Sequence, residues 1–453
     1  MKNELEVRVV KLNSLQDYKE ITPEQEFNDL INASRVLGNK KIAFISSTAH
    51  GGGVALMRHA IIRLFRLLAI DAHWYVLEPD EEVFKITKNK FHNVLQNIAT
   101  PDIRLNKSDK KKYEKWIGKN AKILNNVFKN ADVIVIDDPQ PSGLIPYIKK
   151  INNDAKIVFR SHIHLDAKMA NKKGTNQSVT WKFIWNFVKN SDEFVFHPVK
   201  KFVPKEIPRD KLHFWGASTD PLDGLNKELT KKEMEQSEKD VNEMLAKMNQ
   251  EPIDFNRKYI IQIARFDPSK GISDCLFAYD LLVKKLRKEK IEPPQLVITG
   301  NSSIDDPDGI PVFDYTIELL NSVKFLAIKK DVRVIRLPHN DELLNTLLRK
   351  AYIGLQLSHR EGFEVKVTEG LMKGIPMVVY KTGGIPLQIK DKKDGFLVKT
   401  GDHKKVADYL YLLFTNKKRY RQMSENAKKY YSRDALTIKN ATNWLRLVHE
   451  LTS

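Results

Sequence analysis

Two glutamates, Glu361 and Glu369, lie eight residues apart in a segment that can place both carboxylates at one site. Residues 352–357 have the composition of a buried strand and residues 367–373 that of a helix, so one carboxylate follows the strand and the other lies inside the helix. Ligands bind at the carboxyl ends of strands in open α/β sheets. Carboxylates there accept hydrogen bonds from sugar or ribose hydroxyls, while free N–H groups at the helix start attract an anion. The spacing therefore predicts a site for a ligand with hydroxyls and phosphate, such as an activated sugar.

Two cations, Arg265 and Lys270, lie five residues apart after another predicted strand, residues 259–264. Arginine binds phosphate through its planar fork of N–H donors and lysine through a compact charge, so the pair suits a phosphate or a diphosphate. Two cations in a loop are often only solvated charge. Because these two follow a strand of the same predicted sheet as the glutamate segment, we expect them to act at the same site.

A glycine-rich run, residues 48–55, follows the first predicted strand at residues 41–47. Its glycines, Gly51, Gly52 and Gly53, let the backbone approach a ligand closely and turn into the next helix. The run matches neither the G-x-G-x-x-G pattern nor the P-loop, and tight packing between strand and helix explains it equally well. Both interpretations stay open at this stage.

Two histidines, His162 and His164, close a predicted strand and alternate along it, so both side chains can point to the same face. A metal site would need further ligands, and none follows at a suitable spacing. The acidic runs at residues 137–139 and 305–308 contain Asp beside Pro, which is typical of turns. We therefore assign no metal ligand, and a histidine at a strand end is as often a hydrogen-bonded rim residue as a catalytic one.

Length and composition describe a globular chain of more than one domain. A chain of 453 residues is too long for one ordinary core, so we expect two domains with a small appendage. No apolar run is long enough to span a bilayer, and the N-terminus lacks a signal-peptide pattern. The single cysteine, Cys275, lies in a helical stretch and is expected to pack in the core. These features predict a cytoplasmic protein.

The formal net charge of +19 raises nucleic acid or an anionic membrane as partners. The lysines, however, are spread along predicted helices, for example at residues 110–112, 284–290 and 417–421, and no nucleic-acid motif accompanies them. We interpret them as solvated surfaces that also attract anionic substrates, and we predict no specific nucleic-acid partner.

Strand and helix patterns alternate in two halves of the chain, as parallel α/β sheets require. The predicted domains are an N-terminal extension at residues 1–39, a first domain at 40–250, a second at 251–434, and a C-terminal helix at 435–453 packing on the first domain. The first domain includes a charged amphipathic connector at residues 229–250. Ten strands are predicted, at residues 41–47, 132–137, 156–160, 193–197, 212–215, 259–264, 295–299, 332–336, 352–357 and 377–380.

Several of these motifs together resemble the retaining GT-B glycosyltransferases of family 4, and within them the group that makes or cleaves trehalose. That group contains the prokaryotic trehalose glycosyltransferring synthases and the fungal-type trehalose phosphorylases. Residues 265–268 and 223–226 narrow the resemblance from the broad family to this group. The motifs that carry it are residues 51–55, 138–141, 160–162, 217–226, 265–271, 360–369 and 382–386.

The resemblance implies an α/β GT-B fold, in which two Rossmann-like parallel-sheet domains face each other across a cleft and the C-terminal helix crosses back to the first domain. It implies that Arg265 and Lys270 neutralise the donor phosphates, that Glu361 holds the transferred glucose, and that Glu369 holds a nucleotide ribose. It further implies that His162 lies near the reacting carbon. It also implies that Gly52 and Gly53 contact the donor or the acceptor. Glucose hydroxyls are implied to contact the backbone of Gly362, Phe363, Glu364 and Val365.

The activity that the resemblance implies is retaining α-glucosyl transfer by front-face displacement, with no metal or other cofactor. We expect a synthase that forms α,α-trehalose from a nucleotide-activated glucose and free glucose. One alternative is a phosphorylase that converts trehalose and phosphate to α-glucose 1-phosphate and glucose, and another is an idle sugar-phosphate-binding protein. The length favours the synthase, whereas Glu364, where many relatives carry a small residue, favours the phosphorylase. The nucleotide, the direction, the role of the N-terminal extension and a homodimeric state stay open.

Overall fold

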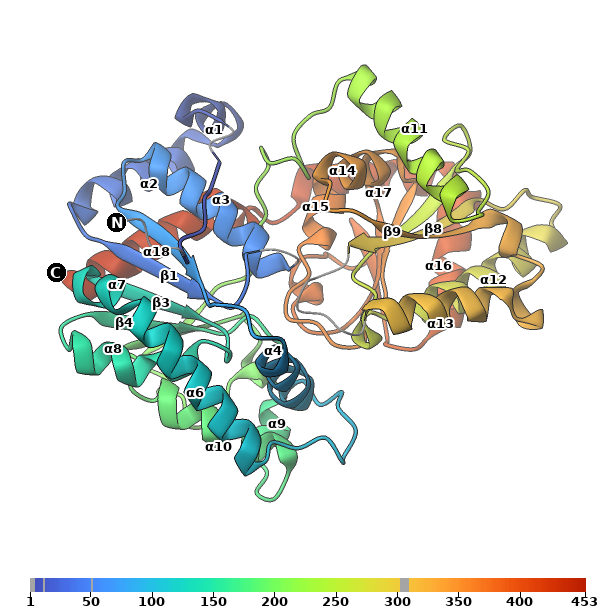
Figure 1. The fold of residues 1–453 in the computed structure, drawn as a ribbon. Helices are drawn as coiled ribbons and strands as arrows, with labels where there is room; N and C mark the ends of the chain where they lie inside the picture. Colours follow the sequence, from blue (N-terminus) through green and yellow to red (C-terminus); the bar gives the residue numbers. More distant parts are fainter. Residues whose placement is uncertain (1–4, 11–12, 50–51, 302–308) are drawn as a thin grey trace. The chain divides into compact units, whose positions relative to one another are not determined.

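The computed structural model describes residues 5–10, 13–49, 52–301 and 309–453 of the chain. By its contacts the chain divides into two compact units (Figure 1). The first unit comprises Met1–Asp220 with Arg433–Ser453, and the second comprises Pro221–Ser432. Each unit has a parallel sheet between layers of helices, so each can bind a ligand at the carboxyl edge of its own strands.

The sheet of the first unit has six parallel strands in the order β2-β1-β3-β4-β5-β6. Strands β1 and β3 are fully buried, apolar runs, as expected of central strands that helices cover on both faces. The bounds are β1 Ile42–Ser46, β2 Ala72–Val76, β3 Val133–Asp137, β4 Lys156–Arg160, β5 Glu193–Phe196 and β6 Leu212–Phe214.

The first unit includes helices from the N-terminal part of the chain and the C-terminal helix. The C-terminal helix α18, Thr437–Thr452, packs against α2, Glu24–Leu37, and α3, Gly53–Leu67, through an apolar stripe that includes buried Trp444. The other helices are α1 Leu15–Ile21, α4 Glu81–Ile86, α5 Asn93–Leu95, α6 Lys107–Ile123, α7 Asn125–Asn130, α8 Ile145–Ile151, α9 Ala167–Ala170 and α10 Asn176–Val188. The remaining short helices are the π-helix η1 Thr87–His92 and the 3-10 helices η2 Ser142–Leu144, η3 Lys200–Phe202 and η8 Arg433–Ala435.

The sheet of the second unit also has six parallel strands, in the order β12-β11-β10-β7-β8-β9. Strands β7 and β10 are neighbours in this sheet, so the loops that follow them leave at the same edge. The bounds are β7 Tyr259–Ile263, β8 Gln295–Asn301, β9 Val332–Leu337, β10 Ile353–Gln356, β11 Met377–Tyr380 and β12 Gly395–Val398.

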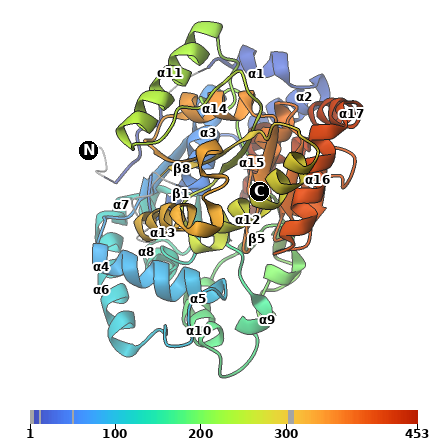
Figure 2. The ribbon, with the colours of Figure 1, turned by 90° about the vertical axis from the view of Figure 1, so that its right-hand side faces the viewer.

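Helices α16 and α17 of the second unit pack together, as Figure 2 shows, and α16 also packs on α12. The charged helix α11 begins at a capping box of Thr230 and Glu233 and packs on α14, so the predicted connector belongs to the second unit. The bounds are α11 Lys231–Lys247, α12 Ile272–Lys288, α13 Gly309–Asn321, α14 Asp341–Lys350, α15 Lys366–Met372, α16 His403–Thr415 and α17 Lys417–Tyr430. The short turns are η4 Pro268–Lys270, η5 Val323–Phe325, η6 Lys329–Asp331 and η7 Ile385–Leu387.

The predicted α/β class is confirmed, and all ten predicted strands are present within two residues of their expected ends. Two strands, β2 and β12, were missed. Both lie at sheet edges, where a short segment needs no long apolar run to be stable. Cys275 is fully buried in the core of the second unit, as expected.

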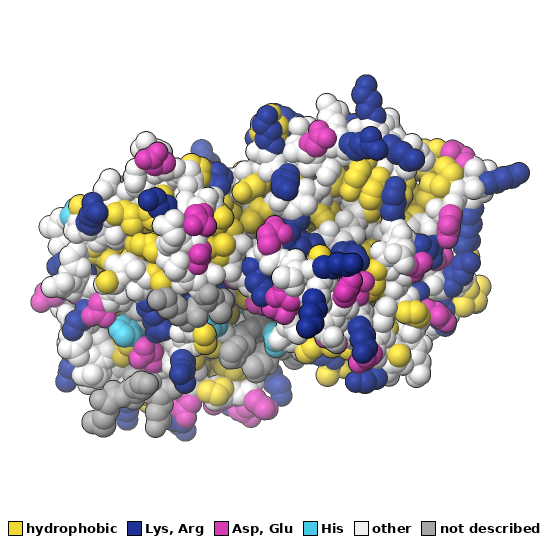
Figure 3. All heavy atoms as spheres, turned by 90° about the horizontal axis from the view of Figure 1, so that it is seen from above, with side chains coloured by type: hydrophobic (Ala, Val, Ile, Leu, Met, Phe, Trp, Pro, Cys, Tyr) yellow, Lys and Arg dark blue, Asp and Glu magenta, His cyan; other side chains and the backbone are white. Residues whose placement is uncertain are grey.

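Surface charge agrees with the interpretation of the lysines. On the face drawn in Figure 3, basic side chains are interspersed with acidic ones. Within the described residues, no helix is both long and apolar enough to cross a membrane.

One glycine fixes the loop that carries Glu361. Gly383 has φ of 52°, and a Cβ added there would lie 1.9 Å from the carbonyl oxygen of Glu361. Gly401 also has a positive φ, of 82°, but an added Cβ would meet nothing within 4 Å. Backbone strain is therefore common to both positions, whereas the steric conflict exists only at Gly383.

We predict that Gly401→Ala lowers the free energy of unfolding by about 1–2 kcal/mol, the cost of an L-residue in the left-handed region. Gly383→Ala should cost clearly more and should also lower activity, because the loop with Glu361 must move. Urea-induced unfolding of both variants and the wild type checks this. Equal losses in the two variants would contradict the role given to Gly383.

Candidate functional site

The second unit brings Lys270 and Glu361 together at the carboxyl edge of its sheet. Lys270 ends η4, which follows β7, and Glu361 lies in the loop after β10. The two loops are joined through the carbonyl oxygen of Ser269, which accepts hydrogen bonds from the backbone N–H of His359 at 2.6 Å and of Arg360 at 3.3 Å. The register of two neighbouring parallel strands thus positions the two predicted site residues.

The ammonium group of Lys270 lies between two carboxylates. It donates to Oε2 of Glu361 and, at 2.8 Å, to Oε2 of Glu364. All three side chains are only 10 to 13% exposed. In a cluster of charges that is this buried, each member depends on the others, because removing one would leave a buried charge without compensation.

In each of these three groups, burial and the oppositely charged partner shift the pKa in opposite directions. Burial lowers the pKa of Lys270, but the Glu361 and Glu364 carboxylates outweigh it and raise the pKa above its usual value. Burial raises the pKa of Glu361 to about 7, with the Glu364 charge adding to the effect of burial and Lys270 opposing it. Burial also acts on Glu364, but Lys270 holds the pKa of that carboxyl below its usual value.

Arg265 lies close enough to this cluster for its charge to lower the pKa of Lys270. Its side chain is partly exposed, and it follows the same strand, β7, as the sequence predicts. The predicted pair of cations is therefore present at the edge of the sheet. One member is buried among carboxylates and the other is more open to solvent.

Glu369 is 1% exposed and is paired with a cation that the sequence analysis did not consider. Lys366 Nζ donates to Glu369 Oε2 at 2.6 Å, and the Lys366 side chain is 15% exposed against 2% for that of Glu369. Lys366 therefore covers the carboxylate on the side that is nearer to solvent. A lysine three residues before a glutamate in a helix is a visible signal for such a pair.

The loop between the two glutamates is held by backbone contacts. The N–H of Gly384 donates to the carbonyl of Gly362 at 2.9 Å, and Gln388 Nε2 donates to the carbonyl of Phe363 at 2.6 Å. Glu364 has φ of 66°, and Val365 precedes the first residue of α15. The predicted glucose contacts of this backbone are not tested by the geometry, but its position beside Glu361 is fixed.

In the first unit, His162 belongs to a buried network of charged side chains. Arg58 binds Asp137 through two hydrogen bonds of 2.7 and 2.6 Å, and both side chains have no exposed surface. His162 Nε2 lies 2.8 Å from the same carboxylate, and the His162 N–H donates to Asp138 Oδ1 at 2.6 Å. The Asp137 contact fixes the tautomer in which Nε2 carries the proton.

A second arginine extends this network towards the last strand. Arg160 donates to the carbonyls of Trp215 at 3.0 Å and Gly216 at 3.2 Å, and His197 Nε2 donates to the carbonyl of His162 at 2.9 Å. Arg58 and His197 were not predicted as site residues. Arg160 and Asp138 were quoted as parts of motifs that carry the resemblance but were given no role, and the run of Asp137 and Asp138 before Pro139 was interpreted as turn chemistry. Arg58 gave a signal, since it is a charge on the apolar face of its helix.

Burial is the largest cause of the pKa shifts of His162, Asp138 and Arg160 in this network. It lowers the pKa of His162 to about 4, with the Arg160 charge as the next cause, so His162 is neutral at pH 7. Burial, with Asp137 as the like-charged neighbour, raises the pKa of Asp138 to about 7. Burial lowers the pKa of Arg160 to about 9. Perturbed values of this size cluster at functional sites, although structural networks also produce them.

Gly52 and Gly53 lie at the start of α3, with Gly52 as the cap residue and Gly53 as the first helical residue. A Cβ added at either would meet no atom within 4 Å, so both border open space. This agrees with close approach of a ligand better than with tight packing between strand and helix. Gly51 of the same predicted motif lies outside the described residues.

Comparison with known proteins finds family matches in both units of the chain. Residues 44–204 match the family described as trehalose synthase, N-terminal domain, and residues 244–430 match glycosyl transferases group 1. The trehalose synthase of Thermococcus litoralis is 33% identical over 96% of both chains. The chain belongs to the trehalose synthase family of glycosyltransferases.

Other relatives of this glycosyltransferase carry a different name. The trehalose phosphorylases of Pleurotus pulmonarius and Grifola frondosa are 42% and 41% identical over 96% of this chain. The chain spans 61% of the length of these phosphorylases.

Solved structures show the fold. A trehalose-6-phosphate synthase, OtsA, superposes with a TM-score of 0.70 at 14% identity, covering 91% of this chain and 99% of that one. The α,α-trehalose-phosphate synthase of Burkholderia xenovorans superposes with 0.64 at 12% identity, over 90% and 99% of the chains. The predicted GT-B fold, with its two Rossmann-like sheets, is thereby confirmed.

The described part of this glycosyltransferase contains no cluster of side chains suited to bind a metal ion. No group of three His, Cys, Asp or Glu side chains there could hold a metal ion. His164 lies against the ring of Phe202, with centroids 4.3 Å apart, whereas His162 is bound to Asp137. The acidic run at residues 305–308 lies outside the described residues.

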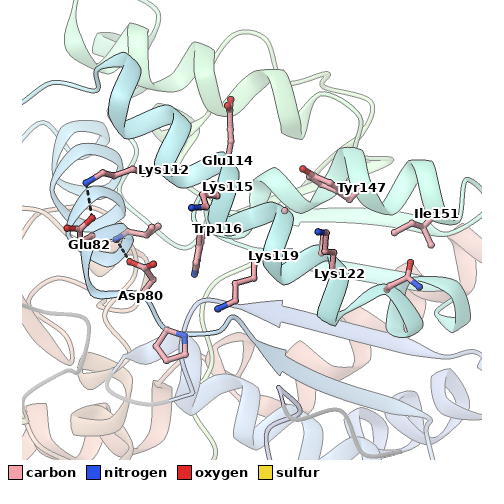
Figure 4. A pocket seen from close by; sticks show the side chains of 15 residues that line it. Asp80, Glu82, Lys112, Glu114, Lys115, Trp116, Lys119, Lys122, Tyr147 and Ile151 are labelled. Carbon is pink, nitrogen blue, oxygen red and sulfur yellow. Dashed lines mark hydrogen bonds and ion pairs between the residues drawn. The ribbon is translucent and has the colours of Figure 1, made fainter.

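A groove of about 1110 Å³ lies along α6, away from these clusters (Figure 4). None of the predicted site residues lines it. Two of its lysines are already paired, Lys112 with Glu82 and Lys119 with Glu78, both at 2.8 Å. The groove therefore presents a surface of mixed charge in which two of the lysines are compensated.

The buried His162 makes a prediction about stability and pH. Its pKa is about 4 in the folded protein against 6.5 for the free group, so below pH 6.5 the unfolded chain binds a proton that the folded one does not. The wild type should therefore lose stability relative to His162→Gln as the pH falls from 6.5 towards 4, by about 3 kcal/mol in full.

Thermal or urea-induced unfolding of both proteins between pH 7.5 and 4.5 measures this difference. Comparing the two proteins at each pH removes contributions that other groups make to both. Parallel stability curves would show that His162 is not buried in its neutral form.

Proposed function

We propose that this chain is a retaining α-glucosyltransferase that exchanges the glucosyl group of trehalose with phosphate, giving α-glucose 1-phosphate and glucose. The observation that carries the proposal is the buried ion-paired carboxylate cluster around Lys270, which lies near Arg265. This cluster, Lys270 with Glu361 and Glu364, offers a buried cation and sugar-binding carboxylates. The phosphorylase relatives, at 42% and 41% identity, support the same reaction.

The state of Glu369 favours phosphate over a nucleotide as the leaving group. In the resemblance described above, this carboxylate would bind the two hydroxyls of a nucleotide ribose. Here Lys366 holds one of its oxygens at 2.6 Å, and only 2% of the side chain is exposed. A ribose would have to compete with this cation for that oxygen, whereas a sugar phosphate needs no contact with Glu369.

The proposed step is a displacement on one face of the sugar. The bond between C1 of one glucose and the bridging oxygen breaks, a phosphate oxygen bonds to C1 from the same side, and the phosphate proton passes to the departing glucose oxygen. Arg265 and Lys270 bind the phosphate, and Glu361 orients the glucose through its hydroxyls. Orientation and charge stabilisation supply the rate enhancement, and no side-chain nucleophile is required.

No metal or other cofactor takes part in the proposed step. Charge on the phosphate is met by the Arg265 guanidinium and the Lys270 ammonium, which need no bridging cation. The proposal also places the small-molecule sugars, rather than a nucleic acid, as the partners of the site.

A nucleotide-activated glucose is the second candidate donor. The trehalose synthase of Thermococcus litoralis, which matches over 96% of both chains, favours this reaction, as does the expectation from the sequence. In that case Lys366 would leave Glu369 when the nucleotide binds. Free glucose would then be the acceptor and α,α-trehalose the product.

The deciding experiment incubates the protein with trehalose and inorganic phosphate and follows products by ¹H and ³¹P NMR. We expect α-glucose 1-phosphate with its α-anomeric coupling, together with glucose. Trehalose formed from UDP-, ADP- or GDP-glucose and glucose, with no reaction of phosphate, would establish the synthase instead. Sugar-phosphate binding without turnover of any donor would establish an idle protein.

We predict that Arg265→Ala and Glu361→Ala each lower kcat by about 100-fold or more, since each removes a group that meets charge or hydroxyls in the transition state. Arg421→Ala, which removes an exposed arginine from α17, is the matched control and should keep the wild-type rate. Circular dichroism verifies that the variants are folded. Rates near that of the wild type in both site variants would refute the assignment.

A further inference from the structure

Lys270 carries a charge that the protein itself already neutralises. Its ammonium group contacts both Glu361 and Glu364, in a site where each side chain is 13% exposed or less. The two carboxylates together outweigh the single charge of this ammonium. A phosphate group that needs this cation must therefore compete with a carboxylate that is already in place.

Of the two carboxylates, Glu364 is the one whose backbone is strained. Its φ of 66° lies in the left-handed region, which costs a residue with a side chain about 1–2 kcal/mol. A glycine would adopt this conformation freely, yet the chain has a glutamate whose carboxylate reaches Lys270 at 2.8 Å. Strain held at a site is a reason to look for a function of the strained side chain.

Glu361 is bound differently. Its Oε1 accepts a hydrogen bond from the N–H of Gly362 at 3.0 Å, while its Oε2 faces Lys270. The other charges that face the pair are those of the Arg265 guanidinium, near Lys270, and of the Lys366 ammonium, near Glu364. The backbone N–H of Lys366 also donates to Glu364 Oε1, at 3.4 Å. Each carboxylate therefore accepts one backbone N–H, but the contact of Glu364 is the longer one, 3.4 Å against 3.0 Å. Together with its strained backbone, this makes Glu364 the carboxylate that a ligand displaces more easily.

We propose that Glu364 is an internal counter-ion, which the phosphate group of the substrate displaces from Lys270 while the glutamate pair takes up one proton. The proposal rests on the phosphate-bearing substrate inferred above. It assigns to the Glu364 side chain a role in selecting and releasing the anion, separate from any contact of its backbone with glucose.

The exchange balances in charge and protons. A phosphate dianion from solution takes the place of the Glu364 carboxylate on Lys270 Nζ, and one proton from solvent binds to Glu361 or Glu364. Without that proton, two carboxylates and a dianion would share a single buried ammonium and one arginine. Burial already raises the pKa of Glu361 to about 7, so the proton is available near neutral pH.

Two consequences follow for binding. Affinity for a dianion should fall as the pH rises above 7, because each bound anion needs a proton from a solution that holds fewer of them. Release of the anion should return the proton and restore the Glu364 contact, so the counter-ion also limits how tightly the product phosphate ester is held.

The test uses sulfate as the probe, because it is a dianion without a titrating proton near neutral pH. Isothermal titration calorimetry at pH 8, in two buffers of different ionisation enthalpy, counts the protons taken up on binding. We expect about one proton for the wild type and close to none for Glu364→Gln. We expect about tenfold tighter sulfate binding in Glu364→Gln, the effect of removing one competing charge.

Glu364→Gly tests the same idea without a polar side chain. It should also bind sulfate more tightly, because the competing carboxylate is gone. Glycine suits the backbone conformation at this position, so the variant should fold. Glu318→Gln, which removes an exposed carboxylate from α13, is the matched control and should behave as the wild type. If both Glu364 variants bind sulfate more weakly, Glu364 positions Lys270 and the proposal is wrong. Equal proton uptake in all proteins would also refute it.

These outcomes are independent of the proposed reaction. Sulfate binding is measured on the purified protein without any sugar. A wild type that uses only nucleotide-glucose would overturn the phosphorylase assignment and leave the counter-ion exchange to be judged by calorimetry. Turnover of trehalose with phosphate, combined with unchanged sulfate binding in the variants, would refute the exchange alone.

Discussion

The placement of one ammonium group, that of Lys270, between Glu361 and Glu364 is the constraint on which the donor site depends. The three side chains are almost fully buried, so none can keep its charge without the others. Every nearby backbone feature serves this contact. The loops after β7 and β10 meet at Ser269, Gly383 admits the Glu361 carbonyl, and Glu364 takes a conformation that glycine normally occupies.

The first unit also contains buried charged groups that compensate one another. Arg58 and Asp137 are both without exposed surface and neutralise each other, and His162 uses the same carboxylate to fix its tautomer. Phe44 and Trp444 border the Arg58 guanidinium at 4.3 and 5.3 Å, so the C-terminal helix shields this pair as well as packing on the unit. Both units therefore hold their polar groups by mutual compensation at the carboxyl edge of a parallel sheet.

Sequence reasoning reached the fold and the residues at the strand ends, but not the contacts among side chains. The strands before Lys270 and Glu361 are buried and mostly apolar, which made their exit loops visible. Glu364 was noticed as a departure from relatives and as an implied backbone contact of glucose, but nothing in a linear sequence shows that its side chain shares an ammonium with Glu361. Arg58, 79 residues before Asp137, is paired through tertiary packing that no spacing rule predicts. Lys366 stood three residues from Glu369 and could have been found from helical spacing.

A crystal structure with α-glucose 1-phosphate bound would test the central claim most directly, namely that the Lys270 cation passes from a protein carboxylate to the substrate phosphate. The account predicts a phosphate oxygen within hydrogen-bond distance of Lys270 Nζ, Glu361 on a glucose hydroxyl, and Glu364 withdrawn from the ammonium. A phosphate group bound elsewhere, with Glu364 still on Lys270, would contradict it.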